Sequence, residues 1–245
     1  MAVAHVLVSA TTQPWVVTFT SHLLHGGALS QGGIRSGCVG LTFDDGPHQH
    51  WTPRLLDCLE KCGLIGTFFV VGRSVKEHPE IVRETRRRGH EVGTHLYWHR
   101  RPNARDTARM NEEIARSRAE LEATLGESIQ LLRFPYGERC GIDARSIRNN
   151  HGLQPVHWTF SSHDSRARSG NEILERVRPR LRGGAIVLMH DCLADEAHGL
   201  PSLYNADRTA MLDSIPLIGR TLVEQNLRAV TVSDLIARRS GRAAQ

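Results

Sequence analysis

The chain has 245 residues, of which 40% are apolar and 23% charged, and a formal net charge of +5 at pH 7. This is the composition of an ordinary globular protein, and the length suits one α/β barrel of about 250 residues. The sequence contains no run of 18 apolar residues, so a membrane span is not expected. Tyr and Phe residues do not interleave with the basic ones, so a nucleic-acid partner is not expected either.

Cysteine usage and the amino-terminal stretch bear on the compartment in which the protein acts. The five cysteines include no C-x-x-C pair, and we interpret all five as reduced thiols, which favours a reducing compartment. The first 15 residues are fairly apolar but carry no Lys or Arg, since the first basic residue is Arg35. Such a stretch is a poor secretory signal, so we expect a cytoplasmic rather than a secreted protein.

The chain divides into an extension, an alternating region and a short tail. Residues 1–37 show no clear period and predict an N-terminal extension with one possible strand at 15–19, and residues 238–245 predict a tail. Between them, apolar runs typical of buried strands alternate with stretches typical of helices. The predicted strands are residues 39–43, 66–71, 90–93, 130–134, 154–158, 185–189 and 227–231, and the predicted helices are residues 52–62, 79–88, 106–125, 143–150, 171–182 and 207–225. This alternation implies one α/β domain over residues 38–237 with a parallel sheet, either doubly wound or closed as a barrel.

Polar side chains follow five of the predicted strands at the point where each strand ends. They are Asp44 and Asp45, then His95 and His99, then Arg133 to Gly137, then Ser161 to Asp164, and finally His190 and Asp191. Because the carboxyl ends of parallel strands meet at one edge of the sheet, we expect these side chains to lie close together. Any one of these groups alone has an ordinary structural explanation, but five such groups at the ends of five strands indicate a site.

The residue types in these groups fit a hydrolytic metal centre. Two histidines spaced i and i+4, such as His95 and His99, lie about 6 Å apart on one side of a helical turn and can share a metal. One of the two aspartates completes a two-His, one-carboxylate face, which leaves positions open for water and substrate. The other aspartate is then placed to act as a general base on water. The order of the motif differs from the H-x-D…H order of iron oxygenases, so hydrolysis is favoured.

The residues of these groups resemble those of a known family, the NodB-type polysaccharide deacetylases (carbohydrate esterase family 4). The resemblance covers residues 38 to about 237 and rests on motifs that arrive in the family's order. These are T-F-D-D-G-P at 42–47, H-x-x-x-H at 95–99, R-F-P-Y-G at 133–137, W…D at 158–164 and L-x-H at 188–190. The resemblance implies a distorted (β/α)7 barrel and hydrolysis of N-acetyl groups on an amino sugar or oligosaccharide. The sequence does not indicate an oligomeric state.

The resemblance also implies a set of roles at the metal. Asp45, His95 and His99 would bind a divalent cation, usually Zn²⁺, although Co²⁺ or another divalent ion would also suit such ligands. Asp44 would be the general base, and Arg133 would hold it in place. The division of the two adjacent aspartates into a base and a ligand therefore comes from the family and not from the spacing.

Further roles concern the leaving amine and the acyl group. His190 would be the general acid that protonates the amine, and Asp164 would hold it. The backbone N–H of Tyr136 would help to stabilise the oxyanion, an effect of roughly 3 kcal/mol in other systems. The expected substrate contacts are Leu188, in the pocket for the acetyl methyl group, together with Pro135 and Trp98.

Three residues depart from the family pattern. Leu96 stands where the family has Ser or Thr, Ser161 where it has Asp, and Ser165 where it has the Trp that walls the acetyl pocket. These departures concern the substrate and the pocket shape. Two alternatives remain open: a hydrolase of a small non-sugar amide or ureide on the same fold, and a non-catalytic carbohydrate-binding relic. Such relatives tend to lose the first Asp or the final His, and here both Asp44 and His190 are present.

Overall fold

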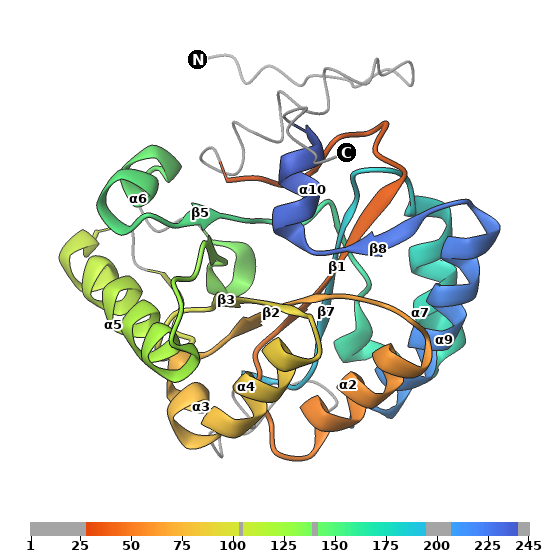
Figure 1. Cartoon of the computed structure of the whole chain (residues 1–245), viewed down its shortest axis with the longest axis horizontal. Helices are drawn as coiled ribbons and strands as arrows, with labels where there is room; N and C mark the ends of the chain where they lie inside the picture. The colour runs from red at the N-terminus through yellow and green to blue at the C-terminus, as the bar shows by residue number, and fades with distance from the viewer. Residues whose placement is uncertain (1–27, 103–104, 139–141, 195–206, 240–245) are drawn as a thin grey trace, which may run out of the picture.

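The computed structural model describes residues 28–102, 105–138, 142–194 and 207–239. A parallel sheet with the strand order β5-β4-β3-β2-β1-β7-β6 forms its centre, and β8 also pairs with β1 (Figure 1). The strands are β1 (Cys38–Asp44), β2 (Thr67–Val70), β3 (Glu91–Thr94), β4 (Leu131–Leu132), β5 (Gln154–Pro155), β6 (Phe160–Ser161), β7 (Ile186–His190) and β8 (Arg228–Val230). Every pairing between them is parallel, so their carboxyl ends share one edge of the curled sheet.

Helices surround the sheet, with α5 and α6 on one side and α7 and α9 packed together on the opposite side (Figure 1). The helices are α2 (Trp51–Lys61), α3 (Gly72–Glu77), α4 (Pro79–Arg87), α5 (Thr107–Leu125), α6 (Ala144–His151), α7 (Gly170–Val177), α9 (Thr209–Glu224) and α10 (Val232–Arg239). Local sequence explains several boundaries. The Asp143 carboxylate caps α6 by accepting hydrogen bonds from the first-turn amides, and Gly152 ends it with a φ of 65°.

The predicted barrel architecture is confirmed, as are the seven predicted strands within the alternating region. The sequence analysis missed α3, α10 and β6. The strand β6 has only two residues and α3 only six, so neither is long enough to show a hydrophobic period. The predicted helix over residues 171–182 is α7 followed by a 3₁₀ turn at Arg178–Arg180, where Pro179 changes the backbone geometry. The possible strand at 15–19 lies outside the described residues.

The residues before β1 fill the space between the two ends of the sheet. The end strands β5 and β6 do not pair with each other. Instead, the Leu29 N–H donates to the Pro155 carbonyl oxygen (2.9 Å), and the Leu29 carbonyl oxygen accepts from the His157 N–H (2.6 Å). On the other side, the Gly32 N–H donates to the Gly184 carbonyl oxygen at 2.8 Å. This segment therefore connects the strand edges and closes the barrel.

Alternation along β1 sends its side chains to two faces. Val39, Leu41 and Phe43 belong to the large apolar cluster between the sheet and the helices. The intervening positions, which include Thr42 and Asp44, face the barrel interior. Burial of a Phe or Leu side chain contributes about 1.5–3 kcal/mol, so the outward residues fix the register of β1. That register places Asp44 at the carboxyl end of the interior face.

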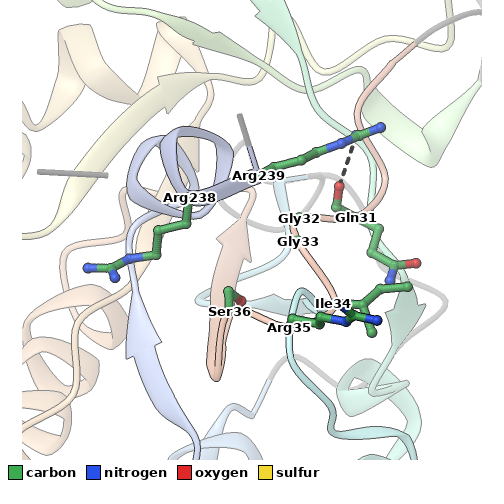
Figure 2. A pocket seen from close by; sticks show the side chains of 8 residues that line it. All are labelled: Gln31, Gly32, Gly33, Ile34, Arg35, Ser36, Arg238 and Arg239. Carbon is green, nitrogen blue, oxygen red and sulfur yellow. Dashed lines mark hydrogen bonds between the residues drawn. The ribbon is translucent and has the colours of Figure 1, made fainter. Parts of the chain in front are cut away.

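Helix α10 covers the amino end of β1. Its residues Val232 and Leu235 join a smaller apolar cluster with Leu29 and other interior residues. The Arg239 guanidinium donates to the Gln31 carbonyl oxygen at 3.3 Å, beside a surface pocket between α10 and the segment before β1 (Figure 2). The side chains of Arg238 and Arg239 point away from each other there, so they do not form a convergent cationic site.

In the described part of the chain, no helix is both long and apolar enough to cross a membrane. The cysteines at positions 38, 58, 62 and 192 are free thiols, as expected. Cys140 lies outside the described residues.

A substitution at Leu29 tests whether side-chain packing anchors the segment whose backbone closes the barrel. Leu29 is buried (7% exposed), so Leu29→Ala should lower the free energy of unfolding by about 2–4 kcal/mol because apolar contacts are lost and a cavity forms. The measurement is urea unfolding followed by circular dichroism. Ile34→Ala is the control: its side chain is 48% exposed, and its effect should stay within about 0.5 kcal/mol. Equal effects of the two changes would contradict this anchoring role of the Leu29 side chain.

Candidate metal centre and catalytic site

The carboxyl end of β1 carries two adjacent buried carboxylates. Asp44 is the last residue of the strand, and Asp45 begins the turn that follows, with a φ of 83°. The exposed fractions of the two residues are 3% and 5%. Two buried negative charges side by side repel each other and lose hydration, so each needs a compensating group. The structure provides a different compensating group for each carboxylate.

The compensating groups at Asp45 are the two histidines after β3. The His99 Nε2 atom lies 3.1 Å from Asp45 Oδ1, and the His95 Nε2 atom lies 3.4 Å from the same oxygen. The other ring nitrogen of His95, Nδ1, lies 2.8 Å from the Arg133 carbonyl oxygen. Since a carbonyl can only accept, Nδ1 carries a hydrogen, and Nε2 is the ring nitrogen that faces Asp45.

The Asp45, His95 and His99 side chains fit a divalent cation. Their ligand atoms lie within 4.8 Å of one another, and the three residues form a cluster of potential ligands. Around tetrahedral Zn²⁺ the ligand atoms would be roughly 3.3 Å apart, close to the Asp45–histidine distances. Burial raises the pKa of Asp45, but the charge of His99 and hydrogen bonds with both histidines outweigh burial and hold that pKa well below its ordinary value. The three side chains are therefore arranged to bind a cation.

Arg133, which follows β4, compensates Asp44. Its NH1 atom donates to Asp44 Oδ1 and to Thr42 Oγ1, both at 2.7 Å, and its NH2 atom donates to the His157 carbonyl oxygen at 3.0 Å. Its guanidinium also lies 4.1 Å from the centre of the Phe69 ring. Burial lowers the pKa of Arg133, while the Asp44 charge opposes that shift. Removing one partner of such a buried pair costs about 3–5 kcal/mol, so this pair holds Asp44 firmly.

The buried Asp164 and the half-buried His190 form a second pair on the other side of β1. Asp164 Oδ1 lies 3.0 Å from His190 Nδ1, and Asp164 Oδ2 accepts from the His190 backbone N–H at 3.0 Å. Burial lowers the pKa of His190, but the Asp164 charge and hydrogen bond, with smaller effects of Asp45 and Asp44, raise that pKa to about 9. This raised pKa favours the protonated form of His190 at neutral pH, and with Nδ1 bonded to Asp164 the proton on Nε2 is the one that can be given.

Two contributors to the site were not predicted. Arg208, at the start of α9, is 1% exposed and its NH1 atom lies 3.5 Å from Asp164 Oδ2. Burial raises the pKa of Asp164, whereas His190, and less strongly Arg208, lowers it, with a net lowering. The backbone N–H of Ala194 donates to Asp45 Oδ2 at 3.2 Å. A backbone donor leaves no signal in the residue types, and Arg208 stands among many arginines in a helical stretch, so neither could be identified from the sequence.

Backbone strain concentrates around the site. Among the described residues, the non-glycine residues with positive φ are Asp45, Leu96, His99, Tyr136, His163 and Asn226. All but Asn226 lie in loops at the carboxyl ends of strands. Such conformations cost of order 1–3 kcal/mol each and persist only where the surroundings hold them. The Tyr136 ring is 43% exposed and lies 4.9 Å, centre to centre, from the His99 ring, so this strained turn borders the metal cluster.

The expected substrate contacts lie on the elements that surround this cluster. Leu188, in β7, pairs with Thr42 of β1, and Pro135 is buried in the turn that carries Tyr136. Trp98 is half-buried, and the guanidinium of Arg100 lies 5.2 Å from its ring centre. Their roles toward a substrate stay predictions.

Two of the three departures from the family pattern, Leu96 and Ser161, make local structural contacts. The Leu96 side chain is buried in the large apolar cluster, which replaces a hydroxyl with apolar contacts. Ser161 Oγ accepts a hydrogen bond from the His163 N–H at 3.1 Å, and Ser165 lies in the 3₁₀ turn Asp164–Arg166. These contacts leave the Asp164–His190 pair intact.

Comparison with known proteins agrees with this geometry. The model of the polysaccharide deacetylase family matches residues 32–156. A chitooligosaccharide deacetylase from Rhizobium leguminosarum bv. trifolii is 36% identical over 182 residues, which are 73% of this chain and 84% of that protein. Among solved structures, a family 4 carbohydrate esterase from Streptomyces lividans in complex with acetate is 32% identical, with a TM-score of 0.67, over 79% of this chain and 92% of that one. A peptidoglycan N-acetylglucosamine deacetylase solved with a hydroxamate-type benzamide is 25% identical, with a TM-score of 0.75, over 89% of this chain and 96% of that one.

The barrel and its strand-end cluster define a hydrolase. The chain belongs to the polysaccharide deacetylase family, and the resemblance noted in its sequence is confirmed.

Substitution of the cluster residues tests the metal centre. His95→Ala and His99→Ala should each reduce bound Zn²⁺ from one equivalent per chain to a small fraction, because two remaining ligands hold the ion weakly. Affinity in the wild-type protein should also fall in mild acid, since protons compete for the histidines. Elemental analysis after dialysis gives the stoichiometry. His151→Ala, a histidine on α6, is the control and should keep the metal; unchanged metal in both site variants would disprove the assignment.

Proposed function

We propose that this protein is a metal-dependent N-deacetylase that hydrolyses the acetamido group of an N-acetylated amino sugar. The observation that carries the proposal is the arrangement of three units at one edge of the barrel. These are the Asp45–His95–His99 cluster, the Asp44–Arg133 pair and the Asp164–His190 pair, connected by the adjacent strands β1 and β7. Together they supply a cation site, a base and an acid, which are the groups that amide hydrolysis requires.

Asp45, His95 and His99 would hold a divalent cation, for which Zn²⁺ is the best candidate because neutral histidines and one carboxylate are typical zinc ligands. When bound, the cation supplies Lewis-acid chemistry: it polarises the amide carbonyl and makes water more acidic. The protein fixes the ligands, since the Arg133 carbonyl orients His95 and the Ala194 N–H holds Asp45.

Asp44 removes the proton from the attacking water. Its Oδ1 atom is held by Arg133, and its Oδ2 atom lies 3.8 Å from His95 Nε2, so this second oxygen faces the metal cluster. The Tyr136 backbone N–H is the candidate donor to the oxyanion that develops as water adds. The strained turn at Tyr136 would then serve to aim this donor, at a benefit of roughly 3 kcal/mol.

His190 completes the reaction by protonating the nitrogen that leaves. Its Nδ1 atom is bonded to Asp164, so the proton on Nε2 is the one available for transfer. The raised pKa of His190 keeps its ring protonated until the proton is transferred to the leaving amine. The overall reaction consumes one water molecule and gives acetate and a free amine.

An N-acetylglucosamine oligosaccharide is the substrate that the relatives favour. The chitooligosaccharide deacetylase relative is matched over 84% of its length, and the peptidoglycan deacetylase structure over 96%. Both are named for N-acetylated glucosamine polymers or oligomers, so the two substrate classes form the panel for the test. A cytoplasmic location stays a separate proposal, which cell fractionation tests.

The decisive assay measures acetate and free amine released from chitooligosaccharides and from peptidoglycan fragments, with and without Zn²⁺. Asp44→Asn should keep the metal but slow turnover at least about 100-fold, since loss of a general base commonly costs that much. Asp45→Asn should instead lose metal affinity. Asp234→Asn, a change on α10, is the control and should leave both properties unchanged. Metal loss in Asp44→Asn with retention in Asp45→Asn would reverse the two roles.

The pH dependence tests the acid. Because His190 acts only when protonated, the rate should fall as pH rises through its pKa, which Asp164 raises. In Asp164→Asn the negative charge is gone, so the alkaline limb of kcat should move to lower pH. Asp143→Asn, which changes an exposed cap of α6, should leave the limb in place. An unmoved limb in Asp164→Asn would mean that His190 is not the acid.

A further inference from the structure

Asp191 is a buried carboxyl group that the proposed mechanism does not use. It directly follows His190 at the end of β7, and its residue is 0% exposed. Its backbone N–H donates to the Asp44 carbonyl oxygen at 3.3 Å, so it lies beside the end of β1. Burying an ionisable carboxyl group costs free energy unless its oxygens accept hydrogen bonds. The contacts of the Asp191 carboxyl group therefore matter.

The Asp191 carboxyl group joins helix α2 to the turn after β1. Its Oδ2 atom accepts from Thr52 Oγ1 at 2.5 Å. A Cβ atom placed on Gly46 would come within 2.1 Å of Oδ2 and 2.6 Å of Oδ1, so the carboxyl group lies directly against the Gly46 backbone. Burial raises the pKa of Asp191 to about 7, with the Asp45 charge acting in the same direction, while hydrogen bonds from Thr52 and the Gly46 amide oppose this.

This turn needs support because it contains the strained Asp45. The Asp45 N–H donates to the Phe69 carbonyl oxygen (3.2 Å), and the Gly46 carbonyl oxygen accepts from the Val71 N–H (2.8 Å). Both of these contacts are made by backbone groups at the end of β2. Asp191 holds the opposite side of the turn with a side chain, which the neighbouring helix α2 in turn fixes through Thr52. A residue with a φ of 83° stays in place only when contacts of this kind surround it.

We propose that Asp191 is a positioning residue for the metal centre: its carboxyl group presses on Gly46 and keeps the Asp45 carboxylate directed at His95 and His99. This inference rests on the metal-dependent function proposed above. The end of strand β7 then has two roles. It carries the acid His190, and one residue later Asp191 supports the metal ligand Asp45. The Ala194 N–H, from the same loop, adds the hydrogen bond to Asp45 Oδ2.

The test is the dissociation constant of Zn²⁺, measured by competition with a chromophoric chelator. Asp191→Ala should raise this constant at least about 10-fold, the usual effect of losing a group that orients a metal ligand. Asp191→Asn keeps an acceptor oxygen for Thr52 and should lose much less affinity. Thermal unfolding of the metal-free variants shows whether the fold is retained, and Asp191→Asn keeps the test available if Asp191→Ala does not fold.

A pair of threonine substitutions separates this role from general stability. Thr52→Val removes the hydroxyl that fixes Asp191 and should weaken Zn²⁺ binding. Thr85→Val is the matched control, because Thr85 is also a buried helical threonine and its hydroxyl donates to the Ile81 carbonyl oxygen at 2.8 Å. It should lower stability to a similar degree and leave the dissociation constant unchanged. Equal dissociation constants in the two variants would count against the proposal.

A double substitution tests whether Asp191 acts through Gly46. In the wild-type background, Gly46→Ala places a methyl group against the carboxyl group and should weaken Zn²⁺ binding. With Asp191→Ala also present, that methyl group has room, so the second change should add little. Fully additive effects would overturn the proposed contact.

The outcomes distinguish this inference from the proposed function. Tight Zn²⁺ binding by the wild-type protein with the same dissociation constant in Asp191→Ala would overturn the role of Asp191 alone. A wild-type protein that binds no divalent cation would overturn the metal-dependent function and this inference with it.

Discussion

The burial of two neighbouring carboxylates at the end of β1 is the constraint on which the site depends. Neither carboxylate can be buried without a partner that compensates its negative charge, and one cation could not compensate the two charges equally. The fold gives Asp44 a permanent partner, the guanidinium of Arg133, and gives Asp45 the two histidines. Because the partners differ, two residues of one type acquire two chemical roles. One keeps an oxygen free to take a proton, and the other serves as a ligand.

The same constraint explains why the site involves so many strands. Arg133 comes from the end of β4, the histidines from the end of β3, and His190 from the end of β7, which pairs with β1. The parallel sheet brings these ends to one edge, and its curvature places them around a common site. The outward apolar residues of β1 fix its register, and the positive-φ turns aim the side chains and amides. Core packing and catalytic geometry are therefore set by the same strand.

Much of this could be predicted from the sequence, because it depends on residue types at regular spacings. Alternation of strands and helices indicated a parallel sheet, the family resemblance indicated the barrel, and the H-x-x-x-H pair after an Asp-Asp strand end indicated the metal cluster. Features that depend on backbone groups or on distant contacts could not be found in this way. The Ala194 N–H has no side-chain signature, and Arg208 meets Asp164 across 44 residues. The strand β6 is too short to show a period, and the closing role of Leu29 involves hydrogen bonds that any residue could make.

The central place of β1 in the sheet has a consequence for how the chain acquires its structure during synthesis. Strand β1 emerges early, yet Thr42 donates to the carbonyl oxygen of Val187, 145 residues later in the chain. At about 5–20 residues per second, translation separates these two segments by about 7–30 s. During that interval β1 lacks its neighbour β7, and the Asp44–Asp45 pair stays in contact with water. Arg133 and the two histidines are synthesised within that interval, so the partners of both carboxylates are present before β7 can pair with β1.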